Sequence, residues 1–114
     1  MEVYRKTAEE EEIIRQTGII GMVRNGEKWI ILKEGKGNWG LGHILRKHYK
    51  DFEINFGIKN RKELVEIILN SVKNADNRMI KKDIIIYYCQ ISEESGIVTV
   101  VDKTNNSIIT SYIV

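Results

Sequence analysis

The sequence predicts an α+β fold in which N-terminal helices pack on a small antiparallel β-sheet. Apolar residues recur at helical spacing through the first two-thirds of the chain, whereas the last third consists of short β-branched runs separated by hairpin-forming residues. Helices segregated from strands in this way are typical of α+β proteins. The 114 residues, 42% hydrophobic and 30% charged, are expected to form one domain over residues 1–114.

The first expected elements are a helix and a β-hairpin. Residues 3–16 fit a helix whose polar face carries four consecutive glutamates at positions 9–12. Residues 19–23 and 28–33 fit two strands joined by a turn, because Asn25-Gly26 favours the positive φ angles of a tight hairpin. The acidic face of the first helix is expected to be solvated, with docking to another protein as the alternative.

The second expected helix covers residues 39–52 and has two chemically different sides. One side is an apolar stripe at helical spacing that includes one histidine. It consists of Leu41, Ile44, Leu45, His48 and Phe52. The other side is basic and carries the second histidine. It consists of His43, Arg46, Lys47 and Lys50. The sequence therefore predicts a helix that buries one side and offers the other to an anionic ligand.

A third helix and three strands complete the predicted fold. Residues 61–73 fit a helix, because Asn60 is a good N-cap and Glu63 follows three residues later, as in a capping box. Its buried stripe is expected to contain Leu64, Ile67, Ile68 and Val72. The strands are expected at 83–91, 97–101 and 107–114, as a three-stranded antiparallel meander.

Composition excludes several classes of protein and favours an anionic partner. The single cysteine cannot form an internal disulfide, and with only two histidines no zinc constellation is expected. No apolar run reaches the roughly 18 residues of a membrane span, and the acidic N-terminus does not resemble a signal peptide. Net charge is +2, but residues 24–50 carry seven basic residues against two acidic ones. This basic region suits a nucleic-acid backbone, although a solvated basic face is the alternative.

The two histidines are the main candidates for chemistry. Histidine titrates near neutral pH and can act as a general acid or base. His43 lies on the basic side of its helix, and the alternative is an ordinary surface histidine. His48 lies in the apolar stripe, so a partly buried core histidine is the favoured interpretation, with a role in orienting a catalytic group as the alternative. A spacing of five residues puts the two side chains about 140° apart on an ideal helix, which argues against a shared cleft.

Two hydroxyl groups in the last strand form a second candidate cluster. Strand alternation places Ile108, Thr110, Tyr112 and Val114 on one face. Thr110 and Tyr112 could together hold a phosphate, and the alternative is that both are simply good strand formers. Trp39, beside Lys36, could stack on a nucleobase or serve as a core residue. The sequence favours a cleft in which His43 faces Thr110 and Tyr112.

Two motifs resemble one nuclease superfamily. The stretch Gly40-Leu41-Gly42-His43-Ile44-Leu45-Arg46-Lys47-His48 resembles its signature "G-L-x-H-I-x-x-(K/R)-H". The ending Ile109-Thr110-Ser111-Tyr112 resembles its terminal "(I/V)-T-A-Y" motif, with serine in place of alanine. The superfamily is the barnase, EndoU, colicin and RelE-like group, or BECR nucleases, and in particular its members in phage head proteins and bacterial polymorphic toxins. The resemblance covers residues 39–114.

The resemblance implies a fold with helices on a small antiparallel sheet, and RNA cleavage without a metal or other cofactor. His43 matches the helix histidine of the family, and Thr110 matches its final-strand hydroxyl. His48 and Tyr112 match positions that recur with varying roles. Lys47 or Arg46 would neutralise the scissile phosphate, and the remaining contacts to RNA are expected from Lys36, Trp39, Arg46 and Lys50.

The expected function is therefore an endoribonuclease toxin domain that forms a 2′,3′-cyclic phosphate and does not cut DNA. From the resemblance alone, transfer RNA is one candidate substrate and a cognate immunity protein is an expected partner. We expect a monomer that acts in the cytosol, with delivery as part of a larger secreted bacterial or phage protein as one route. Two alternatives are a non-catalytic RNA-binding module and a protein-interaction module that docks through the acidic first helix.

Overall fold

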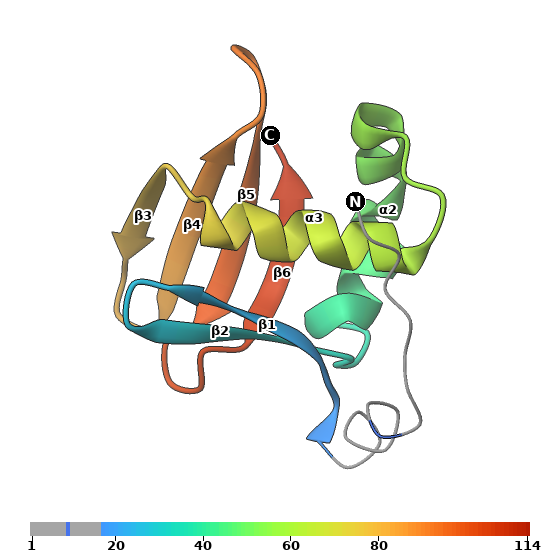
Figure 1. The fold of residues 1–114 in the computed structure, drawn as a ribbon. Coiled ribbons are helices and arrows are strands. Elements are labelled where there is room, and N and C mark those ends of the chain that lie inside the picture. The colour runs from blue at the N-terminus through green and yellow to red at the C-terminus, as the bar shows by residue number, and fades with distance from the viewer. Residues whose placement is uncertain (1–8, 10–16) are drawn as a thin grey trace.

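The computed structural model describes residue 9 and residues 17–114, and it confirms the α+β fold (Figure 1). The helix expected at residues 3–16 lies outside the described residues, except for Glu9. The elements follow one another as β1 (Ile19–Asn25), β2 (Lys28–Lys33), α2 (Gly40–Phe56), α3 (Arg61–Lys73), β3 (Asn77–Ile80), β4 (Ile84–Gln90), β5 (Gly96–Asp102) and β6 (Ile108–Ile113).

The hairpin β1–β2 is confirmed, but its turn lies one residue later than expected. Asn25 pairs with Lys28, so the two turn residues are Gly26 and Glu27, and Gly26 has a φ of +62°. Asn25 stays in the strand, where its side-chain amide donates a hydrogen bond of 2.8 Å to the Val72 carbonyl at the end of α3. The asparagine therefore ties the hairpin to α3 instead of forming the turn.

The C-terminal sheet has four antiparallel strands in the order β3-β4-β5-β6, one more than predicted. Residues 77–80 were not predicted as a strand, because no alternation of apolar and polar residues marks them in the sequence. In the structure all four side chains are exposed. Backbone pairing with β4 holds this edge strand in place. The three predicted strands are confirmed close to their expected bounds.

Helix α3 and the β1–β2 hairpin cover one face of the four-stranded sheet (Figure 1). Helix α3 has its predicted bounds, and Asn60 Oδ1 caps it by accepting a hydrogen bond of 3.0 Å from the Glu63 backbone. The side chain of Glu63 accepts from Lys59 instead of the N-cap residue. Fully buried apolar residues from the hairpin, both helices and the sheet form one core, which includes Leu32, Phe52, Leu64, Ile68, Ile85, Val101 and Ile108.

Helix α2 stands beside the edge strand β6 (Figure 1). Leu41, Ile44 and Phe52 of its predicted stripe are fully buried, whereas Leu45 is half-buried. The helix continues to Phe56, four residues beyond its expected end, and stops where Gly57 adopts a left-handed conformation. The predicted helix ended at Phe52, where the predicted apolar stripe ends. The last turn of the observed helix is exposed, so the stripe of buried residues does not reach it.

A β-bulge in β6 changes the predicted alternation of its side chains. Thr110 pairs with Val100 while Ile108 pairs with Val101, so Ile109 is an extra residue. Ile108 consequently lies on the core face with Ser111, and its predicted place beside Thr110 is wrong. Thr110 and Tyr112 share the opposite face, as predicted, because no irregularity separates them.

Candidate functional site

The sheet face that carries Thr110 and Tyr112 is opposite to the face that α3 covers. Cross-strand pairing brings Val98 beside Tyr112 and Val100 beside Thr110, and all four side chains are half-buried. No helix of the described residues covers this face (Figure 1). We call it the open face, defined by Ile86, Tyr88, Val98, Val100, Thr110 and Tyr112. It offers a surface on which an extended ligand could lie.

The loop before α2 fixes the start of the helix that borders this face. Glu34 is the central residue of the loop, because its carbonyl accepts a hydrogen bond of 2.9 Å from Gly42 and its carboxylate forms an ion pair of 2.7 Å with Arg61. Gly40 has a φ of +77°, and a Cβ atom there would lie 2.9 Å from the Lys33 carbonyl oxygen. Only glycine suits this position, so the chain enters α2 in one fixed direction.

The loop also orients His43. Its Nδ1 lies 3.2 Å from the Gly37 carbonyl oxygen, which can only accept a hydrogen bond. Nδ1 must therefore carry a proton, which leaves Nε2 as the nitrogen that can take up or release one. The Arg46 guanidinium donates to the same carbonyl. Sequence reasoning missed this role of Gly37, because a main-chain acceptor leaves no residue-type signal.

His43, His48 and Tyr112 form a continuous row of rings. The ring centroids of His43 and His48 are 5.5 Å apart, and those of His48 and Tyr112 are 5.7 Å apart. The expectation that five-residue spacing keeps the histidines apart is wrong. Side chains on a helix lean toward its N-terminus, so the His48 ring reaches back toward His43.

This arrangement changes the role expected for His48. The residue is half-buried, as expected for a partly buried core histidine, but its ring also stands between His43 and Tyr112. The sequence favoured a direct contact between His43 and Tyr112. In the structure His48 contacts both rings and links His43 to the open face. We call His43, His48, Thr110 and Tyr112 the histidine–hydroxyl site.

The surroundings of His48 favour its neutral form. Burial of the ring lowers the pKa of His48 most, and the charges of His43 and Lys47 lower it further. Asp51 opposes them and raises the pKa of His48, but the net shift is downward. His48 is thus held as a proton acceptor near neutral pH.

We expect this shift to appear in the pH dependence of stability. Below about pH 6.5, the ordinary pKa of histidine, the unfolded chain binds more protons at position 48 than the folded chain does. The free energy of unfolding should therefore rise with pH between the lowered pKa of folded His48 and about pH 6.5, and this contribution should be constant above it. Urea denaturation at a series of pH values should show a shallower rise for His48→Gln than for the unmodified protein. Identical slopes would contradict the assigned environment of His48.

Four basic side chains are exposed on α2 and on the loop before it. Arg46, Lys47 and Lys50 are exposed on α2, and Lys36 is exposed in the loop before it. Lys47 is near enough for its charge to act on His48. All four were predicted as contacts to an anionic ligand, and their exposure leaves them accessible to one.

One predicted residue, Trp39, lies at a cavity that sequence reasoning did not identify. Trp39 is half-buried and precedes α2, and Lys36 pairs with it through backbone hydrogen bonds of 3.0 and 3.1 Å. The cavity has a volume of about 330 Å³. It is lined by Trp39, Asp102, Asn105, Ser107 and Ile109. Thr110 follows Ile109 directly, and its buried Oγ1 has no hydrogen-bond partner among residues 17–114.

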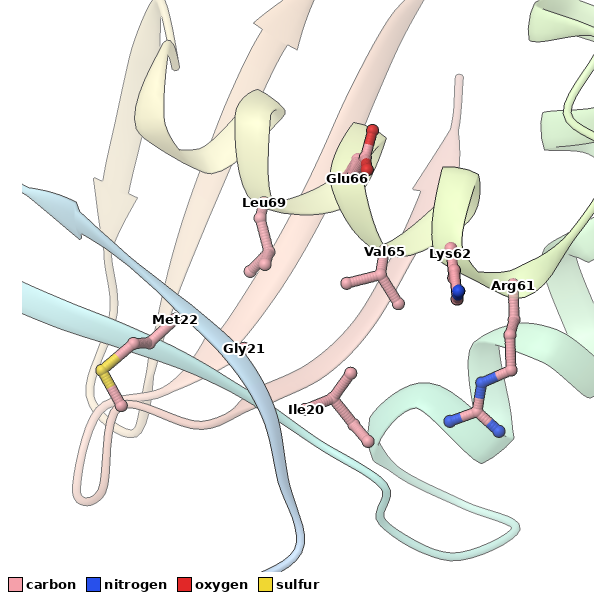
Figure 2. Close-up of a pocket in the computed structure, with 8 residues that line it drawn as sticks. All are labelled: Ile20, Gly21, Met22, Arg61, Lys62, Val65, Glu66 and Leu69. Atoms are coloured by element: carbon pink, nitrogen blue, oxygen red, sulfur yellow. The ribbon is translucent and has the colours of Figure 1, made fainter. Parts of the chain in front are cut away.

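A second groove lies between β1 and α3 and contains none of the predicted site residues. Figure 2 shows Val65 and Leu69 of α3 pointing toward β1, where Ile20 faces them, and Gly21 and Met22 complete the lining on the strand. Its lining is mainly apolar, with charged groups at Arg61, Lys62 and Glu66. It offers neither a histidine nor a hydroxyl group, so the chemistry is better assigned to the histidine–hydroxyl site.

No known protein-family model matches this sequence, and no curated protein matches it. Within the described part of the chain, no helix is long and apolar enough to cross a membrane. The same residues contain no group of three or more histidine, cysteine, aspartate or glutamate side chains that could hold a metal ion.

Proposed function

We propose that the protein is a metal-independent endoribonuclease whose active site is the histidine–hydroxyl site. The observation that carries the proposal is the row formed by His43, His48 and Tyr112 at the border of the open face. Two adjacent imidazoles can supply both a general base and a general acid, which is what cleavage of RNA by its own 2′-hydroxyl requires. Exposed cations beside the row would attract the phosphate backbone.

The environments of the two histidines suggest a division of roles. His48, held neutral, would remove the proton from the 2′-hydroxyl, whose oxygen then attacks the adjacent phosphorus. The bond from phosphorus to the 5′-oxygen breaks, and His43 would donate a proton from Nε2 to that leaving oxygen. The products are a 2′,3′-cyclic phosphate and a free 5′-hydroxyl. RNA supplies the nucleophile, so DNA would not be cleaved.

The remaining side chains would stabilise negative charge as the phosphorane forms. Thr110 and Tyr112 stand on the same face of β6, and their hydroxyl groups would donate hydrogen bonds to phosphate oxygens. Lys47 lies beside His48 in sequence and would neutralise the scissile phosphate, and Arg46, Lys50 and Lys36 would hold flanking phosphates. Donors that are already in place stabilise the transition state without reorganisation.

The resemblance to BECR nucleases supports a biological setting for this activity. Both motifs that carry the resemblance fall on the histidine–hydroxyl site, at residues 40–48 and 109–112. We propose a toxin domain that acts on cytosolic RNA, with transfer RNA as one candidate substrate and an immunity protein as its partner. A larger bacterial or phage protein would deliver it.

A direct test is incubation of the protein with total RNA in excess EDTA over a range of pH. The unmodified protein is expected to cut RNA and leave cyclic phosphate ends, and His43→Ala and Thr110→Ala should each cut much more slowly. Lys82→Ala, which changes an exposed residue in the β3–β4 turn, serves as the matched control and should retain full activity.

Three outcomes would contradict parts of the proposal. Absence of cleavage by the unmodified protein at every pH would overturn the nuclease function. Cleavage that His43→Ala leaves unchanged would overturn the assigned site. Salt-sensitive RNA binding without cleavage would favour a non-catalytic RNA-binding module, a function that the exposed cations of α2 alone could support.

A further inference from the structure

Strand β1 has one edge that no other strand of the described residues pairs. The hairpin is a two-stranded sheet, so β1 pairs with β2 along one edge only. Helix α3 runs beside β1 (Figure 1), and the Asn25 side chain bonds to the Val72 carbonyl at its end. The two elements are close, because a Cβ atom at Gly21 would lie 2.8 Å from Leu69 Cδ1. The unpaired edge of β1 therefore borders the groove between β1 and α3.

The register of the hairpin shows which main-chain groups point out from this edge. Asn25 and Lys28 flank a two-residue turn and form a hydrogen-bonding pair, and such pairs alternate with non-bonded pairs along an antiparallel ladder. Met22 lies opposite Ile31, three pairs further on, so it belongs to a non-bonded pair. The Ile31 N–H agrees with this, because it donates a hydrogen bond of 2.9 Å to the Asn106 carbonyl, away from β1. The N–H and C=O groups of Met22 thus point away from β2.

The outward main-chain groups of β1 are free to accept another strand. Arg24 also belongs to a non-bonded pair, and within residues 17–114 the main chain of Met22 and Arg24 forms no hydrogen bond outside the hairpin. Edge strands are commonly protected by lysine or proline. The edge strand β3 runs directly into Lys81 and Lys82, whereas residues 19–25 of β1 contain neither lysine nor proline. The edge of β1 is therefore the less protected of the two.

The groove beside this edge has an apolar middle and a basic end. It has a volume of about 160 Å³, and Ile20, Val65 and Leu69 supply its apolar side chains. Figure 2 shows Lys62 at the end of the groove near Ile20, and the carboxylate of Glu66 directed away from β1. Lys62 forms no ion pair within the described part of the chain. This end of the groove suits an acidic side chain.

We propose that the groove is a docking site for an extended segment of a partner protein, which adds to β1 as an antiparallel strand. Strand addition to an exposed sheet edge is a general mode of peptide recognition, in which the main chain gives affinity and alternate side chains give specificity. The main chain of the segment pairs with Met22 and Arg24. Its apolar side chains enter the groove at alternate positions, and an acidic side chain at its C-terminal end lies beside Lys62.

The direction of the segment follows from the direction of β1. Strand β1 begins near Lys62 and ends near the last turn of α3, where Asn25 bonds to Val72. An antiparallel segment therefore reaches Lys62 with its C-terminal end. The groove contains none of the residues of the histidine–hydroxyl site, so this docking does not depend on the ribonuclease function.

A synthetic peptide tests the docking site on the full chain. The probe is a fluorescently labelled Thr-Val-Thr-Val-Thr-Glu with an amidated C-terminus, which places valine and glutamate on one face of a strand and threonine on the other. Fluorescence anisotropy should give a dissociation constant below about 1 mM. In the proposed register the threonine nitrogens pair with β1 and the valine nitrogens point away from it. Methylation of a threonine nitrogen should weaken binding by about 2- to 12-fold per lost hydrogen bond, and methylation of a valine nitrogen should have a much smaller effect.

A charge substitution tests the basic end of the groove. Lys62→Gln should weaken binding of the peptide by about 2- to 5-fold, the usual size of an exposed ion pair. Lys82→Gln, at the β3–β4 turn, is the matched control and should leave binding unchanged. A peptide that ends in lysine instead of glutamate should lose nothing in Lys62→Gln. Equal loss for both peptides would overturn the assigned position of the acidic side chain.

Amide hydrogen exchange measured by NMR locates the bound peptide. Exchange of the Met22 and Arg24 amides should slow when the peptide is added, and exchange in β3 should not change. No binding at about 1 mM peptide, equal effects of the two kinds of methylation, or slowed exchange only in β3 or α2 would overturn the proposal. Amides of Met22 and Arg24 that are already protected without peptide would also overturn it, because the chain itself or a second copy would then cover the edge. Dependence of that protection on protein concentration would identify the second copy.

Discussion

Replacing His48 by glutamine is expected to slow RNA cleavage by about 10²- to 10⁴-fold, the usual contribution of a general acid or base. His43→Gln should cause a loss of similar size, because the two rings would act on the same reacting phosphate from 5.5 Å apart. The double variant should be little slower than the slower single variant, since groups that act as a unit give losses that are far from additive. Initial rates on a short RNA for all four proteins measure this.

The pH dependence of the same rates assigns the two roles. The unmodified protein should show a bell-shaped profile, because one histidine must be neutral while the other is protonated. His48→Gln should remove the rise on the acidic side, and His43→Gln should remove the fall on the alkaline side. Lys82→Gln is the control and should follow the unmodified protein. Fully additive losses would contradict a shared transition state, and an unchanged rate in His43→Gln would exclude that residue from the chemistry.

Local signals in the sequence identified most of the fold. Helix α3 was predicted with its observed bounds because Asn60 and Glu63 mark its start and a regular apolar stripe follows. The hairpin and the last three strands were predicted because β-branched runs alternate with turn residues. Strand β3 was missed because its exposed side chains carry no periodic pattern, and only pairing with β4 makes it a strand. Such pairing is a tertiary effect.

The candidate site was predicted residue by residue, but its geometry was not. Thr110 and Tyr112 share a face because strand alternation is a local rule that holds between them. The bulge at Ile109 depends on pairing with β5, so the displacement of Ile108 could not be read from the residues alone. The contact between His43 and His48 depends on side-chain directions, which a helical wheel ignores.

The same limit explains why the cavity beside Trp39 was not foreseen. Its lining comes from the loop before α2 and from the β5–β6 turn, which are more than 60 positions apart in the chain. The sequence identified Trp39 as a candidate for stacking but treated residues 103–106 only as hairpin residues. That the Ser107 hydroxyl has no hydrogen-bond partner within residues 17–114 becomes apparent only when the fold buries that side chain.

Phe52→Ala is expected to lower the free energy of unfolding by about 3–5 kcal/mol, the usual cost of removing a large buried aromatic side chain. Phe52 is fully buried in the core and stacks on Phe56 at a centroid distance of 6.2 Å. It is also the last fully buried side chain of α2, the helix that carries both histidines. Urea denaturation of the variant and the unmodified protein gives the difference directly.

Ile54→Ala provides the matched control on the same helix. Ile54 is 70% exposed, so its truncation should change the free energy of unfolding by less than about 0.5 kcal/mol.

At a temperature low enough for Phe52→Ala to stay folded, this variant should still cut RNA at a rate close to that of the unmodified protein. Phe52 lies one turn beyond His48 and outside the row of rings. A loss no greater than that of Ile54→Ala would contradict the packing of α2 against the core. Full folding with abolished cleavage would show instead that Phe52 positions the histidines, and α2 would then link core packing directly to the chemistry.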